Sequence, residues 1–248
     1  MVTDICRGHR SDGTPCPNTE LIKAHIVARG FADEARGPYS HNWLISDQRV
    51  SHIQLGVWDS GILCATCDGK LGDLDNYALS VCRRFAGKHV VRPDGLFEMS
   101  GVDGDKFATF ILSLLWRASI TTRPEFAKTS LGSYEDRARD VIFGAQRLSA
   151  LPEYELFVER YTPRGNFTGG YTMPARMTVG LTGWYFGLLG FRILAKLAPW
   201  PAAYAGEVVN GNDKLIGSFV DYERTTEGQG MTAKARLEAA RDQQRSSC

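Results

Sequence analysis

Residues 63–67 read Leu63-Cys64-Ala65-Thr66-Cys67, which places two cysteines three positions apart after an apolar approach. Two thiolates at this spacing can bind one tetrahedral metal ion from a single tight turn, and the ion then needs two more ligands. The N-terminal segment offers Cys6, His9 and Cys16. We expect the four cysteines Cys6, Cys16, Cys64 and Cys67 to hold a structural zinc ion. A competing ligand set uses Cys6 and His9 with the second pair. A third interpretation is that the C-x2-C spacing is accidental or redox-active.

The composition is that of an ordinary globular protein. Of the 248 residues, 43% are hydrophobic and 23% are charged, and the net charge is only +1, so the chain as a whole has no strong field toward nucleic acid or membrane. The N-terminus shows no basic segment followed by an apolar one, so we expect a cytoplasmic protein. Cysteines there act as metal ligands or buried apolar residues more often than as disulfides.

The most apolar run, residues 179–200, is interrupted by four glycines and carries Arg192 and Lys196. A bilayer span needs about 20 predominantly apolar residues with few charges. We therefore expect this run to form core structure, and we expect no membrane contact.

We expect an α+β fold in two parts. Residues 1–90 would form the zinc-binding module and residues 91–248 an α+β domain, with a turn at residues 93–95 between them. Periodicity predicts a helix over 105–119 and a second from Ser133, whose Ser-Tyr-Glu-Asp start resembles a capping box. Strands are expected at 156–158, 172–181 and 215–222, a buried strand or helix at 184–194, and a surface helix after 230.

His25 lies in an apolar stretch between the two cysteine pairs. A histidine before an Ile-Val run, then a loop, then Cys-x2-Cys-Asp on a helix has the order of a ββα-metal (HNH-type) nuclease. In such enzymes the histidine on the first strand is the general base for a water, and a divalent ion stabilises the phosphate and the leaving oxygen. The competing interpretation is a histidine that is simply part of the core.

Several motifs resemble those of an uncharacterised bacterial and phage HNH-like family. Residues 16–27, Cys-Pro-Asn-Thr-Glu-Leu-Ile-Lys-Ala-His-Ile-Val, resemble its C-G-x-x-x-L-x-K-S-H-I-I-P opening. Residues 62–68 and 75–78 are similar to its L-L-C-x-x-C-E…E-x-Y-x pattern. The Leu-Trp-Arg-Ala-Ser element at 115–119 matches its L-W-R-A-S helix, and 131–139 resembles L-G-x-x-E-E-x-L-R. The resemblance covers residues 6 to about 148.

The resemblance implies a zinc-stapled HNH-like fold and favours Cys16 over His9 as a ligand. The chain also departs from HNH chemistry, because Ala24 precedes the histidine where active enzymes usually carry an acidic ligand. Asp68 replaces the usual His or Asn after the second cysteine. A catalytic Mg²⁺ or Mn²⁺ could still be held by Asp68, Asp75 or Asn76, and the two aspartates lie seven apart on one helix face. A solvated helix surface is the alternative for both carboxylates.

Basic residues follow the second cysteine pair. Lys70, Arg83 and Arg84 are the candidates for contacting phosphate, against the alternative of ordinary solvated charges. His41 and His52 lie between His25 and the second cysteine pair, and we interpret both as structural or exposed.

The leading hypothesis is an HNH-like protein that acts on nucleic acid and hydrolyses phosphodiester bonds, with His25 as base and a divalent ion on Asp68, Asp75 or Asn76. The rival is a non-catalytic zinc-stapled binding protein, such as a phage or mobile-element inhibitor of a host nucleoprotein (defence) complex. Ala24 and the near-neutral charge favour the rival. A redox protein that uses Cys64 and Cys67 is the third hypothesis.

Overall fold

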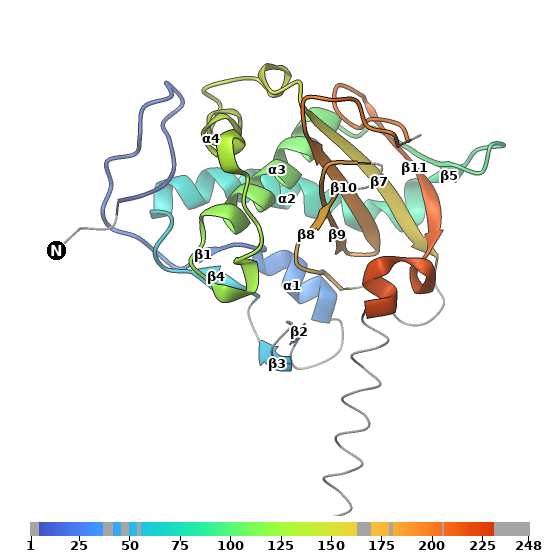
Figure 1. Cartoon of the computed structure of the whole chain (residues 1–248), viewed down its shortest axis with the longest axis horizontal. Coiled ribbons are helices and arrows are strands. Elements are labelled where there is room, and N and C mark those ends of the chain that lie inside the picture. The colour runs from blue at the N-terminus through green and yellow to red at the C-terminus, as the bar shows by residue number, and fades with distance from the viewer. Residues whose placement is uncertain are drawn as a thin grey trace, which may run out of the picture.

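The computed structural model describes residues 5–36, 42–45, 50–53, 56–162, 170–178, 181–204 and 206–230, with backbone only for 42–45 and 50–53. Two adjoining helices, α2 (Ala65–Lys88) and α3 (Gly104–Ile120), run through the middle of the molecule (Figure 1). The cysteine-bearing loop lies at one end of them and the large sheet at the other. The mixed α+β class predicted from the sequence is confirmed.

Helix α3 is the most buried element and confirms the helix predicted over 105–119. Asp103 caps its N-terminus by accepting a hydrogen bond from the backbone N–H of Lys106 at 2.9 Å. Its side chains are buried nearly all round, which is typical of a helix enclosed by other elements rather than lying on a surface. The helix ends at Ile120, before Pro124.

The N-terminal region consists of short elements around α2. Strand β1 (Ala24–His25) pairs antiparallel with β4 (Trp58–Asp59), and α2 begins six residues after β4. Helix α1 (Arg29–Arg36) and the hairpin of β2 (Asn42–Ile45) and β3 (Val50–Ile53) lie between β1 and β4 in the chain.

The C-terminal region is a seven-stranded sheet in the order β5-β6-β11-β7-β10-β9-β8. All neighbouring strands are antiparallel except β7 and β11, which are parallel. The bounds are β5 (Val90–Val91), β6 (Phe97–Ser100), β7 (Tyr154–Thr162), β8 (Ala175–Met177), β9 (Gly183–Leu188), β10 (Phe191–Leu197) and β11 (Lys214–Asp221).

The buried core is continuous across residue 90, where the sequence suggested a division. The ring of Phe85 on α2 packs edge-on against Phe97 of β6 at 5.0 Å and Phe191 of β10 at 4.8 Å. Helix α2 therefore contributes to both regions. The division into 1–90 and 91–248 stays a prediction.

The sequence patterns predicted the C-terminal turns and strands only in part. Residues 93–95 form the expected turn, between β5 and β6. The ambiguous segment forms two strands, β9 and β10, which reverse direction at Leu189 and Gly190, both with positive φ. The expected strands at 156–158 and 215–222 correspond to β7 and β11, whereas among the described residues of 172–181 only Ala175–Met177 forms a strand. The tail after 230 lies outside the described residues.

The second predicted helix starts later than its sequence suggests. A 3-10 turn, η2 (Gly132–Tyr134), precedes α4 (Glu135–Ile142), and no side chain caps α4. Ser133 therefore does not form the expected capping box. The remaining 3-10 turns are η1 (Pro124–Phe126), η3 (Leu148–Ala150) and η4 (Tyr222–Arg224). Within the described part of the chain, no helix has the length and apolarity needed to cross a bilayer.

Strand β11 packs tightly against its neighbours at Gly217, so adding one methyl group there should lower the stability of the fold. A Cβ at Gly217 would lie 2.1 Å from the carbonyl oxygen of Val158 and 2.6 Å from the ring of Phe97. Gly217→Ala should therefore lower the free energy of unfolding by about 1–3 kcal/mol or more. Gly72→Ala on α2 meets open space and should stabilise by about 0.4–1 kcal/mol. Urea unfolding measures both, and equal effects would contradict the packing described for β11.

Candidate metal centre and neighbouring histidine site

Four cysteine sulfurs come together at the start of α2. The Sγ atoms of Cys6, Cys16, Cys64 and Cys67 all lie within 4.8 Å of one another. The four residues are at most 8% exposed. Cys64 immediately precedes α2 and Cys67 lies in its first turn, whereas Cys6 and Cys16 come from the N-terminal loop. This arrangement confirms that the four cysteines form one possible metal site.

Backbone hydrogen bonds hold the N-terminal loop against this helix start. The N–H groups of Gly8 and Cys64 donate to the Cys6 sulfur at 3.4 and 3.3 Å. Such donors stabilise a thiolate. A Cβ at Gly8 would lie 2.6 Å from the Cys67 sulfur, so only glycine fits beside the cluster. The loop is therefore shaped around the four sulfurs.

The electrostatics of the cluster favour a bound cation. Burial raises the pKa of Cys67, and the neighbouring thiols raise it further, because adjacent thiolates repel one another. Burial would also raise the pKa of Cys64, but hydrogen bonds from the Cys67 N–H and the neighbouring thiols hold that pKa below its ordinary value. A divalent ion offsets this repulsion, and a set of four thiolates is typical of structural zinc.

His9 lies outside the cluster. The imidazole is 6% exposed, and its Nδ1 lies 2.9 Å from Asp140 Oδ1 on α4. The close group of ligand atoms contains the four sulfurs and no histidine nitrogen. Of the two ligand sets left open by the spacing, the geometry therefore supports Cys16 rather than His9.

His25 is the last residue of β1. Its side chain lies on the opposite face of the β1–β4 pair from the side chain of Ala24. It lies directly opposite Trp58 in the register, whereas Ala24 lies opposite Asp59. Ala24 and Asp59 are buried, and His25 and Trp58 are half-buried. Asp59 is fully engaged, because its carboxylate accepts hydrogen bonds from Gly61, Thr121 and Thr122. Asp59 therefore has a structural role, and its side chain lies on the face of the strand pair opposite to His25.

A buried arginine connects His25 to both central helices. Arg117 on α3 donates from Nη1 and Nη2 to the two carboxylate oxygens of Asp75 on α2, at 3.0 and 2.7 Å. The same Nη1 donates to the backbone carbonyl of His25 at 3.0 Å. Arg117 is 1% exposed and Asp75 is 8% exposed. The pair therefore fixes the backbone of His25, and Asp75, a predicted metal ligand, has both oxygens bonded to Arg117.

Asp68 is the remaining acidic residue of the predicted catalytic set. It lies half-buried in the first turn of α2. Burial raises the pKa of its carboxyl group, the positive charge of Arg117 acts in the opposite direction, and the negative charge of Asp75 raises that pKa further. Among the described residues, no group donates a hydrogen bond to this carboxylate. A carboxylate held partly out of water without a donor is suited to receive a cation.

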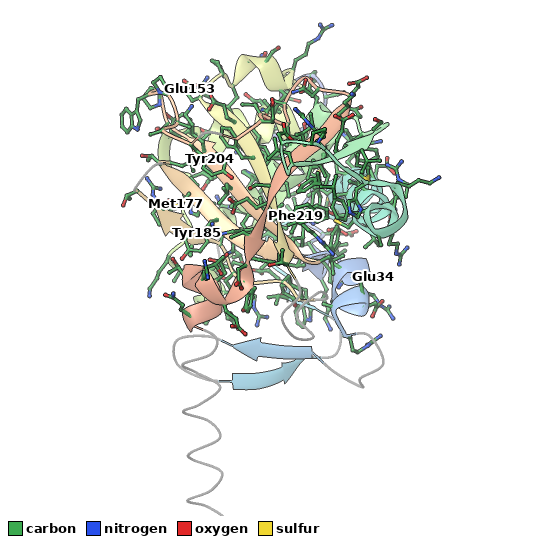
Figure 2. All side chains as sticks on the ribbon, turned by 90° about the vertical axis from the view of Figure 1, so that its right-hand side faces the viewer. Glu34, Glu153, Met177, Tyr185, Tyr204 and Phe219 are labelled. Carbon is green, nitrogen blue, oxygen red and sulfur yellow. The ribbon has the colours of Figure 1, made fainter. Side chains whose placement is uncertain are left out.

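The other predicted site residues are dispersed. Asn76 is exposed on α2, away from the buried positions that carry Asp75. Arg83 is paired with Glu34 of α1, which Figure 2 labels, and Arg84 Nε lies 3.4 Å from the carbonyl of Ser80. Lys70 is exposed on α2. His41, and the side chain of His52, lie outside the described residues.

Within the described part of the chain, the four cysteines are the one close group of three or more potential metal ligands. His25, Asp68 and Asp75 therefore do not form a ready-made three-ligand site. A second ion near His25 would be bound by few protein ligands and several waters, as is common for Mg²⁺.

The residue that sequence reasoning missed is Arg117. It is the arginine of the Leu-Trp-Arg-Ala-Ser element, whose resemblance was visible but whose role was not. Trp116 packs edge-on against Phe143, and Ser119 donates to Glu135 at 2.6 Å. Trp116 and Ser119 therefore contact the two ends of α4, whereas Arg117 contacts α2 and β1, so this short motif connects α3 to three neighbouring elements.

Comparison with known protein families, with curated proteins and with solved structures found no match to this chain.

The cysteine cluster predicts one zinc ion per chain, measured by inductively coupled plasma mass spectrometry of the purified protein. Cys16→Ser should lose the metal and lower the melting temperature, because a structural zinc site contributes directly to folding. His9→Gln and Cys82→Ser should keep one zinc, since both residues lie outside the group of four sulfurs. Zinc retained by Cys16→Ser but lost by His9→Gln would contradict the ligand set.

The buried ion pair predicts an asymmetric response to mutation. Arg117→Met leaves the Asp75 charge buried and unpaired, which should cost about 3–5 kcal/mol of the free energy of unfolding. Arg117→Met combined with Asp75→Leu should recover most of this loss. Arg137 and Glu153 form an exposed two-bond pair, so Arg137→Met should cost less than about 1 kcal/mol. Similar losses for Arg117→Met and Arg137→Met would show that Arg117 is not holding the two helices.

Proposed function

We propose that this protein is an HNH-like phosphodiester hydrolase acting on nucleic acid. The observation that carries the proposal is that β1, the strand of His25, packs against α2, the helix of Asp68. His25 ends the first strand of an antiparallel pair, and Asp68 opens the helix that follows the pair. The four-cysteine cluster sits at the start of the same helix, as the resemblance to HNH-like proteins implies.

In the proposed reaction, His25 accepts a proton from a water molecule that attacks the phosphodiester phosphorus. Asp68 provides the carboxylate for a divalent ion, because its oxygens have no donor in the described structure. Mg²⁺ or Mn²⁺, when bound there, stabilises negative charge on the phosphate and on the leaving oxygen. Arg117 holds the carbonyl of His25 at 3.0 Å and thereby fixes the strand that carries the base. The cysteine-bound zinc has a structural role.

A second function is favoured by two observations. Ala24 is fully buried where an active HNH enzyme usually has a metal ligand, and Asp75 is occupied by Arg117. The same fold could therefore act as a non-catalytic binding protein, for instance an inhibitor of a host nucleoprotein complex from a phage or mobile element. In that case His25 and Asp68 would have no role in the interaction.

The proposal predicts metal-dependent cleavage of DNA or RNA by the purified chain in Mg²⁺ or Mn²⁺. His25→Ala should lower the cleavage rate by about 10²–10⁴-fold, the usual contribution of a general base. Asp68→Asn should raise the Mn²⁺ concentration needed for half-maximal cleavage. Asp73→Asn is the matched control, because Asp73 is an exposed aspartate of the same helix.

No cleavage by the wild-type chain, or equal cleavage by His25→Ala, would contradict the hydrolase function. A single stoichiometric partner recovered from host lysate by both the wild type and His25→Ala would then favour the non-catalytic function. Each result separates the two functions, because only the hydrolase depends on the imidazole.

A further inference from the structure

The solvent-facing side of the β1–β4 pair carries an aromatic ring and a cation beside His25. Residues directly opposite each other in an antiparallel pair share a face, so the side chains of His25 and Trp58 lie on the same side. Lys23 precedes His25 by two positions, and its Nζ lies 4.7 Å from the centroid of the Trp58 ring. Lys23 is exposed, and the other two side chains are half-buried. The three groups form a small platform, defined here as Lys23, His25 and Trp58.

Hydrogen bonds hold the strand that carries Trp58 in place. Arg123 donates from Nη1 to the carbonyl oxygen of Trp58 at 3.1 Å. The next residue, Asp59, accepts from the hydroxyl of Thr121 at 2.5 Å and the N–H of Thr122 at 3.2 Å. The strand that carries Trp58 is thus tied to the segment after α3. A backbone held in this way gives the Trp58 ring a fixed point of attachment, so less of the strand has to be ordered when a ligand binds.

Lys23 differs from the nearby arginines in its charge partner. Its ammonium group contacts the Trp58 ring and has no carboxylate partner within the described residues. Arg123, which binds the carbonyl of Trp58, is already paired with Glu125, and Arg29 and Arg36 of α1 are paired with Asp33. An exposed cation–π contact is weak, at about 0.5–1 kcal/mol. The ammonium can therefore exchange the ring for a phosphate at low cost.

We propose that this platform binds an unpaired nucleotide of a single-stranded nucleic acid. The base stacks on Trp58, Lys23 moves from the ring to the phosphate, and His25 lies alongside. Single strands are favoured over duplexes because a base paired inside a helix is covered by its neighbours and cannot reach the ring. This inference rests on the proposed function, since it names the substrate class of the same site.

The test is binding of a fluorescein-labelled twelve-nucleotide DNA, single-stranded or as a duplex, followed by polarisation without added divalent ion. Trp58→Leu should bind the single strand at least about fivefold more weakly, from the usual strength of base–aromatic stacking. Trp58→Phe keeps a ring and should bind within about twofold of wild type. Trp200→Leu is the control, because Trp200 is an exposed tryptophan, 58% accessible, that follows β10 of the large sheet rather than the β1–β4 pair. Lys23→Gln should reduce the salt dependence of log Kd by about 0.7.

Several results would overturn the inference. They are the absence of single-strand binding by the wild type, equal losses in Trp58→Leu and Trp200→Leu, and duplex binding as tight as single-strand binding. Circular dichroism and zinc content of Trp58→Leu exclude a folding defect as the cause of a loss, and Trp58→Phe provides the rescue.

The binding test and the cleavage test can fail separately. Single-strand binding that depends on Trp58, without cleavage in Mn²⁺, would remove the hydrolase function and leave the platform. Cleavage that depends on His25 while Trp58→Leu binds and cuts like wild type would remove the platform and leave the hydrolase function.

Discussion

A single buried guanidinium connects three elements of this protein that carry the residues of the proposed site. Arg117 binds Asp75 with two hydrogen bonds and the His25 carbonyl with a third, so α3, α2 and β1 meet at one side chain. A buried arginine is stable only when its charge and its donors are matched, which makes the geometry of the three elements interdependent. The backbone position of His25 is therefore set by the buried Arg117 as well as by the pairing of β1 with β4.

The cysteine cluster holds the start of α2 against the N-terminal loop. Cys64 and Cys67 lie at the start of α2, and Asp68 follows at once, so an ion held by the sulfurs would also orient the carboxylate. The cysteine cluster and the Arg117 network thus act on the same helix from two directions. The strand of His25 is held against the helix of Asp68, and both side chains are free of hydrogen bonds inside the described structure.

The sequence predicted the parts of this arrangement that depend on spacing or periodicity. The apolar period of residues 105–119 predicted α3, and the C-x2-C step predicted two of the four clustered cysteines, while the spacing left Cys16 and His9 as competing candidates for a further ligand. The roles of Asp75 and Arg117 were not predictable, because they are 42 positions apart and nothing local marks them as partners. The strand pair β1–β4 was equally hidden, since each strand has only two residues and no pattern of its own. Long-range pairing of charges and of very short strands depends on the tertiary fold.

The proposed divalent-ion site of His25 and Asp68 is separate from the cysteine cluster. Anomalous diffraction from a crystal of the full chain soaked in Mn²⁺ gives the sharpest test of it. We expect a zinc peak among the four sulfurs and a separate manganese peak bound to the Asp68 carboxylate near the His25 imidazole. A zinc peak at the cysteines with no manganese beside Asp68 would contradict it.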